Sequence, residues 1–220
     1  MGEAERFAQQ AARGIDGVEC LTGRCGRMRL RFELCSDGRI SAARGRTIRL
    51  PAYRVRNQTA PYLHEIAHAL LPCPGAPVWF SEGLACYVES AVAERFGGYD
   101  SRLFTARGNA GVDVDARAWL DDARGHAVLR FVGKRGEPPR MAHDRPNVAA
   151  PFYVLSHSLV RFIALHAGDG ALARVARARG FVQTLKRATG RGAAEWRRSW
   201  LAQAMKQQNG YSSNRNVRGG

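Results

Sequence analysis

Hydrophobic and polar residues alternate in two short stretches near the start of the chain. Residues 28–34 carry four apolar side chains on one face and charged ones on the other, and residues 47–51 place Ile48 and Leu50 on the side opposite Arg49. Alternation with a period of two predicts β-strands with one buried face. We therefore expect two strands of a small sheet in the N-terminal part of the chain.

Apolar residues at helical spacing predict helices on both sides of these strands. Residues 3–13 form a short amphipathic pattern, which Gly14 and Gly17 are expected to end. Residues 59–71 predict a second helix, and a third is expected to begin near Ser81 as its N-cap. After residue 151 the pattern predicts four further helices, over residues 152–165, 171–178, 181–188 and 193–206.

The segment between these groups of helices, residues 100–147, is rich in glycine, proline, arginine and aspartate. Only residues 127–132 predict a strand there. Long connections with little structure of their own are typically functional in a compact domain, so we expect an insertion or lid. Residues 211–220 are polar and glycine-rich and are expected to form a disordered tail.

These patterns indicate one α+β domain over residues 1–210, with strands near the N-terminus and a mainly helical C-terminal half. The chain has 220 residues, which is long enough to bury a sizeable core. No stretch approaches the 18 consecutive apolar residues of a transmembrane helix, and the N-terminus lacks the apolar region of a signal peptide. The protein is thus expected to be cytoplasmic by default, or exported if a leader has been removed.

The net charge and the cysteines indicate which binding partners, structural metal sites and disulfide bonds are expected. The formal net charge of +15 permits binding to nucleic acid or to acidic substrates, but the arginines do not cluster in a single run of about 5–8 residues, which favours an ordinary basic surface. No cysteine pair forms C-x-x-C, so a separate structural zinc site is not expected. Cys20 and Cys25 could pair in an exported protein, Cys35 is left without an expected role, and Cys73 and Cys86 are expected to be buried small side chains.

The sequence His64-Glu65-Ile66-Ala67-His68 lies within the helix predicted at residues 59–71. Residues four apart on a helix share a face, so His64 and His68 can direct two imidazole nitrogens at one zinc ion. Glu65 lies on the flank of that face, where a carboxylate can reach a metal-bound water without filling a ligand position. We expect one Zn²⁺ per chain.

Catalytic zinc usually takes three protein ligands and keeps one position open for water. Glu82 can supply the third ligand if the helix beginning near Ser81 packs against the first helix. Glu89 is the alternative third ligand, seven residues further along the same helix face. Its other interpretations are a solvated charge or a partner for a ligand histidine.

Residues 79–85 (Trp-Phe-Ser-Glu-Gly-Leu-Ala) complete a pattern that resembles the gluzincin metallopeptidases, in which H-E-x-x-H is followed by a glutamate in a W-x-x-E-G-x-A setting. The chain looks most like bacterial peptidase MA-like domains, over roughly residues 28–203. The resemblance implies a zincin-like fold with a small mixed sheet packed on the H-E-x-x-H helix, and an active-site cleft between the sheet and the helical half. It also implies that an edge strand just before this helix binds extended peptide.

The resemblance further implies a tyrosine on the helix after the lid, whose hydroxyl stabilises the oxyanion of the tetrahedral intermediate. Tyr153 matches this position, although an aromatic core residue is an equal interpretation. His157, one turn further on, is expected to support the site or to be a satisfied helix histidine.

The expected activity is zinc-dependent hydrolysis of peptide bonds, with endopeptidase favoured over aminopeptidase action. Glu65 would act as general base and then as general acid. Two alternatives stay open. One is a zinc-binding regulator that resembles the ImmA-like proteins and acts on a partner protein. The other is a basic nucleic-acid-associated protein in which the zinc site is secondary.

Overall fold

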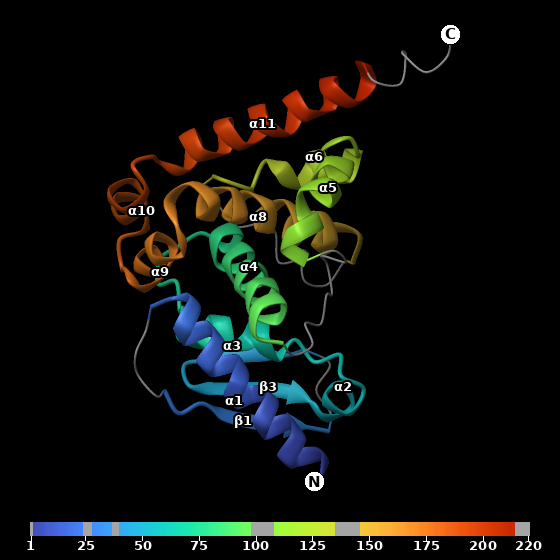
Figure 1. Cartoon of the computed structure of the whole chain (residues 1–220), viewed down its shortest axis with the longest axis vertical. Helices are drawn as coiled ribbons and strands as arrows, with labels where there is room; N and C mark the ends of the chain where they lie inside the picture. Colours follow the sequence, from blue (N-terminus) through green and yellow to red (C-terminus); the bar gives the residue numbers. More distant parts are fainter. Residues whose placement is uncertain (1, 24–27, 37–39, 98–107, 135–145, 214–220) are drawn as a thin grey trace.

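The structure is a computed structural model that describes residues 2–23, 28–36, 40–97, 108–134 and 146–213. It confirms the α+β class, with one small sheet and a majority of helices (Figure 1). The sheet and α1 lie at one end of the molecule, α11 lies at the other, and α4 and α8 lie between them. The elements in chain order are α1 (Glu3–Leu21), β1 (Arg31–Cys35), β2 (Ala42–Arg44), β3 (Thr47–Pro51), α2 (Ala52–Arg56), α3 (Tyr62–Leu70), α4 (Val78–Phe96), α5 (Gly108–Leu120), α6 (Ala123–Leu129), α8 (Pro146–Ala167), α9 (Asp169–Arg177), α10 (Phe181–Thr189) and α11 (Ala193–Ser213).

The sheet is mixed and has the strand order β1-β3-β2, with β3 parallel to β1 and antiparallel to β2. Strand β3 occupies the predicted residues 47–51, and Ile48 and Leu50 are fully buried. The expectation that this strand forms an edge is wrong, because it pairs on both sides. The edges are β1 and β2, and β2 has no counterpart among the predicted strands. Strand β1 begins at Arg31, later than the alternation suggests, and Leu34 near its end is 49% exposed.

Helix α1 runs to Leu21, so the prediction that Gly14 and Gly17 end it is wrong. Both glycines face neighbouring helices. A Cβ atom at Gly14 would lie 2.7 Å from Cδ2 of Leu63, and one at Gly17 would lie 2.7 Å from Cγ1 of Val92. The missing side chains let α1 pack closely on α3 and α4, and this packing outweighs the cost of about 1 kcal/mol that each glycine imposes on a helix.

Helix α4 begins at Val78, and Pro77 occupies the N-cap position, so the prediction of Ser81 as N-cap is wrong. The earlier start follows from tertiary packing. Trp79 and Phe80 in the first turn are fully buried, with ring centroids 6.1 and 5.0 Å from that of Phe181 on α10. Ser81 therefore lies inside the helix.

Helix α8 is the central helix of the second half, and every residue from 151 to 160 is buried. The segment Val148–Ala167 is long and apolar enough to cross a membrane, but most of it is buried inside the fold. Its apolar surface packs against α4, α5 and α6. This burial is what the central helix of a packed core requires.

The described part of the expected lid is helical. The prediction of a strand at residues 127–132 is wrong, because α6 ends at Leu129 and a turn follows. Helix α5 buries Val112 and Ala116, and Asp113 on the same helix accepts a hydrogen bond from Ser158 of α8 at 2.8 Å. Residues 98–107 and 135–145 lie outside the described residues, so a lid stays a prediction.

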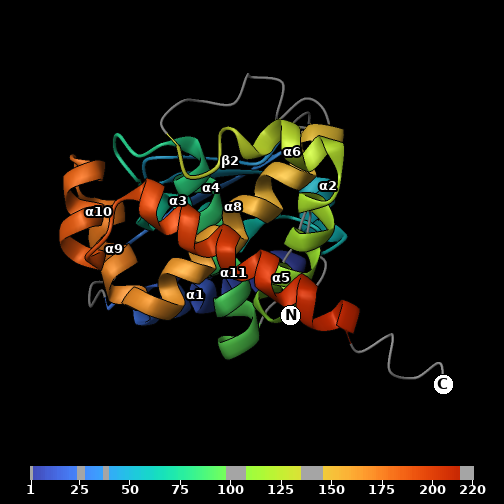
Figure 2. The same cartoon turned by 90° about the horizontal axis from the view of Figure 1, so that it is seen from above.

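The last helix, α11, lies across α8 in the view from above (Figure 2). Trp196 and Trp200 are buried, and the indole nitrogen of Trp200 donates a hydrogen bond to Oγ of Ser158 at 3.0 Å. The helix extends to Ser213, past the predicted end at residue 206 and into the predicted tail. Residues 214–220 lie outside the described residues. The predicted helices corresponding to α9 and α10 are confirmed within a few residues.

Candidate metal centre

The first turns of α3 carry His64 and His68, which the helical repeat places on one face. Their Nε2 atoms lie 3.1 Å apart, and their ring centroids are 4.7 Å apart. Ile66 and Ala67 between them are buried and hold this helix in the core. The local geometry expected from the H-E-x-x-H sequence is therefore present.

Glu82 on α4 brings a carboxylate to these two rings. Its Oε2 atom lies 3.3 Å from Nε2 of His64 and 3.5 Å from Nε2 of His68. The three residues form a group that could hold a metal ion. A tetrahedral zinc ion with bonds of about 2.0–2.1 Å holds its ligand atoms about 3.3–3.4 Å apart. The three observed separations match one face of such a tetrahedron, so the donor set fits a zinc ion.

A second layer of side chains contacts the far nitrogens of the two rings. Oε2 of Glu89 lies 3.6 Å from Nδ1 of His64, and Sγ of Cys86 lies 3.8 Å from the same atom. Oγ of Ser81 lies 3.5 Å from Nδ1 of His68. Carboxylates in such positions commonly fix the tautomer and orientation of a ligand histidine. Of the interpretations of Glu89, this geometry matches the partner of a ligand histidine.

The charges of the group also suit a cation. Burial lowers the pKa of His64. Contacts with Cys86, Glu82 and Glu89 raise it, and together they outweigh burial, so the resulting pKa lies well above the ordinary value. Burial raises the pKa of Glu82, but hydrogen bonds with His64 and His68 hold it well below its ordinary value. When no metal is present, His64 therefore carries a proton, and the neighbouring carboxylates stabilise its positive charge. A divalent cation would displace that proton.

Glu65 is only 6% exposed and follows His64 on α3. Burial raises its pKa, and the charges of His64 and His68 lower it by a smaller amount, so the pKa is raised overall. The two histidines affect the pKa of Glu65 because its carboxylate lies near His64, His68 and Glu82. A carboxylate beside a metal site with a raised pKa is suited to accept and return a proton.

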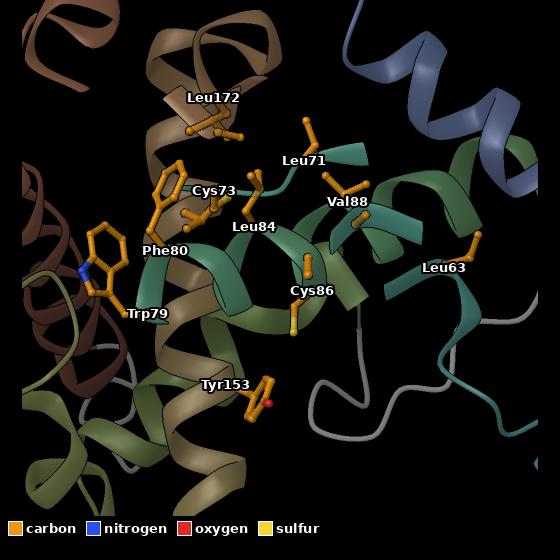
Figure 3. Close-up of a cluster of buried hydrophobic side chains, with 14 of the residues drawn as sticks. Leu63, Leu71, Cys73, Trp79, Phe80, Leu84, Cys86, Val88, Tyr153 and Leu172 are labelled. Atoms are coloured by element: carbon orange, nitrogen blue, oxygen red, sulfur yellow. The ribbon is translucent and has the colours of Figure 1, made fainter. Parts of the chain in front are cut away.

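Tyr153 enters the same region from α8. Its ring centroid lies 6.2 Å from that of His64, and Figure 3 shows the side chains of Tyr153 and Cys86 projecting into the space between their two helices. Burial, followed by the negative charge of Glu82, raises the pKa of Tyr153. The hydroxyl is therefore protonated at neutral pH and can donate a hydrogen bond.

The contacts of Cys86 and Ser81 with the two histidines were not predicted from the sequence. A signal was present, since Glu82, Cys86 and Glu89 are spaced by four and three residues and share one face of a helix. Cys86 and Cys73 are buried, as expected. Cys20 is exposed, and Cys25 lies outside the described residues, so a bond between them stays untested.

His157 lies fully buried one turn after Tyr153. Its Nε2 atom lies 2.6 Å from Oδ1 of Asn109, whose amide nitrogen donates to the carbonyl oxygen of Tyr87. This arrangement assigns the proton to Nε2 of His157. The other ring nitrogen, Nδ1, is buried without a hydrogen-bond partner. Burial lowers the pKa of His157 to about 3, so the ring is a neutral structural element that joins α8 to α5.

No protein-family model matches the chain, and neither a curated protein nor a solved structure matches it. A functional assignment therefore depends on the residues and the geometry of the metal centre.

Proposed function

We propose that the protein is a zinc-dependent peptidase with a zincin-like fold, and that His64, His68 and Glu82 bind one Zn²⁺. The observation that carries the proposal is the group of three ligand atoms, separated by 3.1–3.5 Å, with the carboxylate of Glu65 buried beside it. The resemblance of residues 64–68 and 79–85 to the gluzincin pattern supports the same activity. Structural zinc sites are closed by four protein ligands, whereas three ligands are typical of catalytic ones.

A bound zinc ion supplies Lewis acidity, which polarises a carbonyl oxygen and lowers the pKa of water. The residues of the chain transfer the proton and stabilise the developing negative charge. Glu65 accepts the proton of the attacking water and delivers it to the leaving amine nitrogen. The hydroxyl of Tyr153 donates a hydrogen bond to the oxygen that becomes negatively charged in the transition state.

The residues that contact Nδ1 of each histidine have a supporting role. The carboxylate of Glu89 lies 3.6 Å from Nδ1 of His64 and attracts the ring proton to that nitrogen, which leaves Nε2 unprotonated and able to act as a ligand. Ser81 can do the same for His68. The substrate is a peptide or protein chain, and cleavage within the chain is favoured because the sequence lacks the G-x-M-E-N-type motif with which aminopeptidases bind a free amino terminus.

Glu65→Gln is the variant that tests this function. The amide keeps the size of the side chain but cannot take up a proton, so the variant should retain one zinc per chain and lose peptide hydrolysis. Zinc is measured by mass spectrometry, and hydrolysis is followed with a fluorescence-quenched peptide library. Glu3→Gln, at an exposed position of α1, is the matched control and should behave as wild type.

Two results would contradict the proposal. One is wild-type hydrolysis by Glu65→Gln, which would remove this residue from the mechanism. The other is a zinc-loaded wild-type chain that cleaves no peptide of the library, which would leave a metal centre without this activity.

A further inference from the structure

The excess of positive charge is concentrated in the segment that forms the sheet. Residues 24–56 contain ten arginines and two acidic residues, which is a net charge of +8, whereas the whole chain of 220 residues has +15. The segment contains no lysine. More than half of the net charge thus belongs to about one seventh of the chain.

The strand register places part of this charge on one face of the sheet. Ile48 of β3 is fully buried, so the neighbouring Thr47 and Arg49 point to the opposite, outer face. Residues paired across strands share a face. Arg31 of β1 and Arg44 of β2 both pair with Thr47, so they lie on the outer face as well.

The three arginines of this outer face are accessible. The side chains of Arg31 and Arg49 are 76% and 60% exposed, and Arg44 is also exposed. Among the described residues, the acidic residue of this face is Glu33. Its Oε1 atom lies 3.3 Å from Nε of Arg31, and its Oε2 atom lies 3.5 Å from Nε of Arg49. One carboxylate therefore offsets only part of the charge of the three guanidinium groups.

We infer that the outer face of the sheet, defined by Arg31, Arg44 and Arg49, binds the phosphate backbone of nucleic acid. Neighbouring strands lie about 4.8 Å apart, so β1 and β2 hold their arginines about 10 Å apart. Duplex DNA carries one charge per about 1.7 Å of its axis, so a surface of this width faces several phosphates. Guanidinium groups bind two phosphate oxygens at once, which lysine cannot do.

The same face indicates how the nucleic acid is bound. The other outward positions on the described strands hold Thr47, Ala42, Cys35 and Pro51, none of which is aromatic. A surface without aromatic side chains gives bases nothing to stack on, and phosphate contacts carry no sequence information. Binding is therefore independent of sequence, favours the higher charge density of duplexes, and uses the face of the sheet opposite the buried Ile48. This function goes beyond the peptidase activity proposed above.

The experiment measures binding of a fluorescent 20-base-pair DNA duplex to the zinc-loaded full chain by anisotropy, at several salt concentrations. The test variant is Arg31→Glu/Arg44→Glu/Arg49→Glu. The control is Arg6→Glu/Arg13→Glu/Arg198→Glu, which changes the net charge equally at exposed positions of α1 and α11. Wild type should bind at 50 mM salt with a steep salt dependence.

The test variant should lose at least about tenfold in affinity, and its slope of log K against log salt should become shallower by about 0.9 for each lost phosphate contact. The control should keep the wild-type slope. Glu33→Gln should bind about threefold more tightly than wild type, a gain that a misfolded variant cannot show. Polyglutamate at equal charge should compete more weakly than unlabelled DNA.

Three results would overturn the inference. In the first, wild type does not bind the duplex at 50 mM salt. In the second, the test variant and the control lose affinity and slope equally, which would make the binding a property of net charge or of the C-terminal arginines. In the third, polyglutamate competes as well as DNA, which would assign the face to acidic polypeptides.

Discussion

A Cβ atom on Gly83 of α4 would lie 2.5 Å from the carbonyl oxygen of Ser156 on α8. The two helices therefore meet where no side chain fits between them. Glu82 immediately precedes this contact, and Tyr153 lies about one turn before Ser156 on α8. The close approach at Gly83 thus sets the distance between the third candidate ligand and the candidate oxyanion donor.

Gly83→Ala should destabilise the fold by about 1–3 kcal/mol, because the added methyl group forces two packed helices apart. The shift should also weaken zinc binding, because Glu82 moves relative to α3. Urea denaturation and chelator competition measure the two effects. Gly170→Ala in α9 is the control, since its Cβ atom would meet only a distant Arg174 side chain at 3.8 Å. A Gly83→Ala protein as stable as wild type would show that the contact is loose.

Glu82→Gln should reduce zinc affinity far more than Glu89→Gln. The first change removes a ligand carboxylate, whereas the second removes the partner of Nδ1 of His64, which typically costs about 10–100-fold. Competition with a chromogenic chelator gives both affinities, and His64→Ala and His68→Ala should abolish stoichiometric binding. The opposite ranking of the two glutamates would assign the third ligand to Glu89.

Tyr153→Phe should lower kcat by about 10²–10³ with little change in KM or zinc content, because an oxyanion hydrogen bond strengthens only as charge develops. Tyr87→Phe is the matched control. The Tyr87 hydroxyl donates to Asp169 at 2.7 Å, so its loss should cost about 0.5–1.5 kcal/mol of stability and leave kcat unchanged. A fully active Tyr153→Phe enzyme would assign this tyrosine to the core alone.

The stability of the metal-free protein should fall as the pH decreases below about 6.5, in part because of His157. Its pKa is about 3 in the folded chain and about 6.5 when unfolded. Between these values the unfolded state binds one more proton, so stability is fully present above pH 6.5 and is lost toward pH 3, with a slope of up to about 1.4 kcal/mol per pH unit.

His157→Gln should remove this part of the slope, because glutamine can donate to Asn109 but does not titrate. Urea denaturation at pH 7, 6, 5 and 4 in the presence of a chelator measures the difference from wild type. His126→Gln, at an exposed position on α6, should retain the wild-type slope. An unchanged slope in His157→Gln would mean that the ring is already accessible to protons in the folded state.

Features that depend only on residues close together in the sequence could be predicted from the sequence. The spacing of His64 and His68 places both rings on one helix face wherever that helix lies. The alternation at residues 47–51 likewise determines that Ile48 and Leu50 lie on the buried side of a strand. Both depend on the geometry of a single helix or strand, which the local pattern contains.

Tertiary packing decided the features that join distant segments. Gly14 and Gly17 were expected to end α1, because glycine is a poor helix former. Their missing side chains instead allow α1 to pack on α3 and α4. The position of β3 in the middle of the sheet depends on β1 and β2, which no pattern within β3 could indicate.

The candidate site divides in the same way. The sequence by itself determined the two histidines, the adjacent Glu65 and the helix that carries them. Only the tertiary structure brought Oε2 of Glu82 within 3.5 Å of both rings and placed Glu89 behind His64, because those distances depend on how α3, α4 and α8 pack. The register of the three strands, and not the order of residues, gathered Arg31, Arg44 and Arg49 onto one face of the sheet.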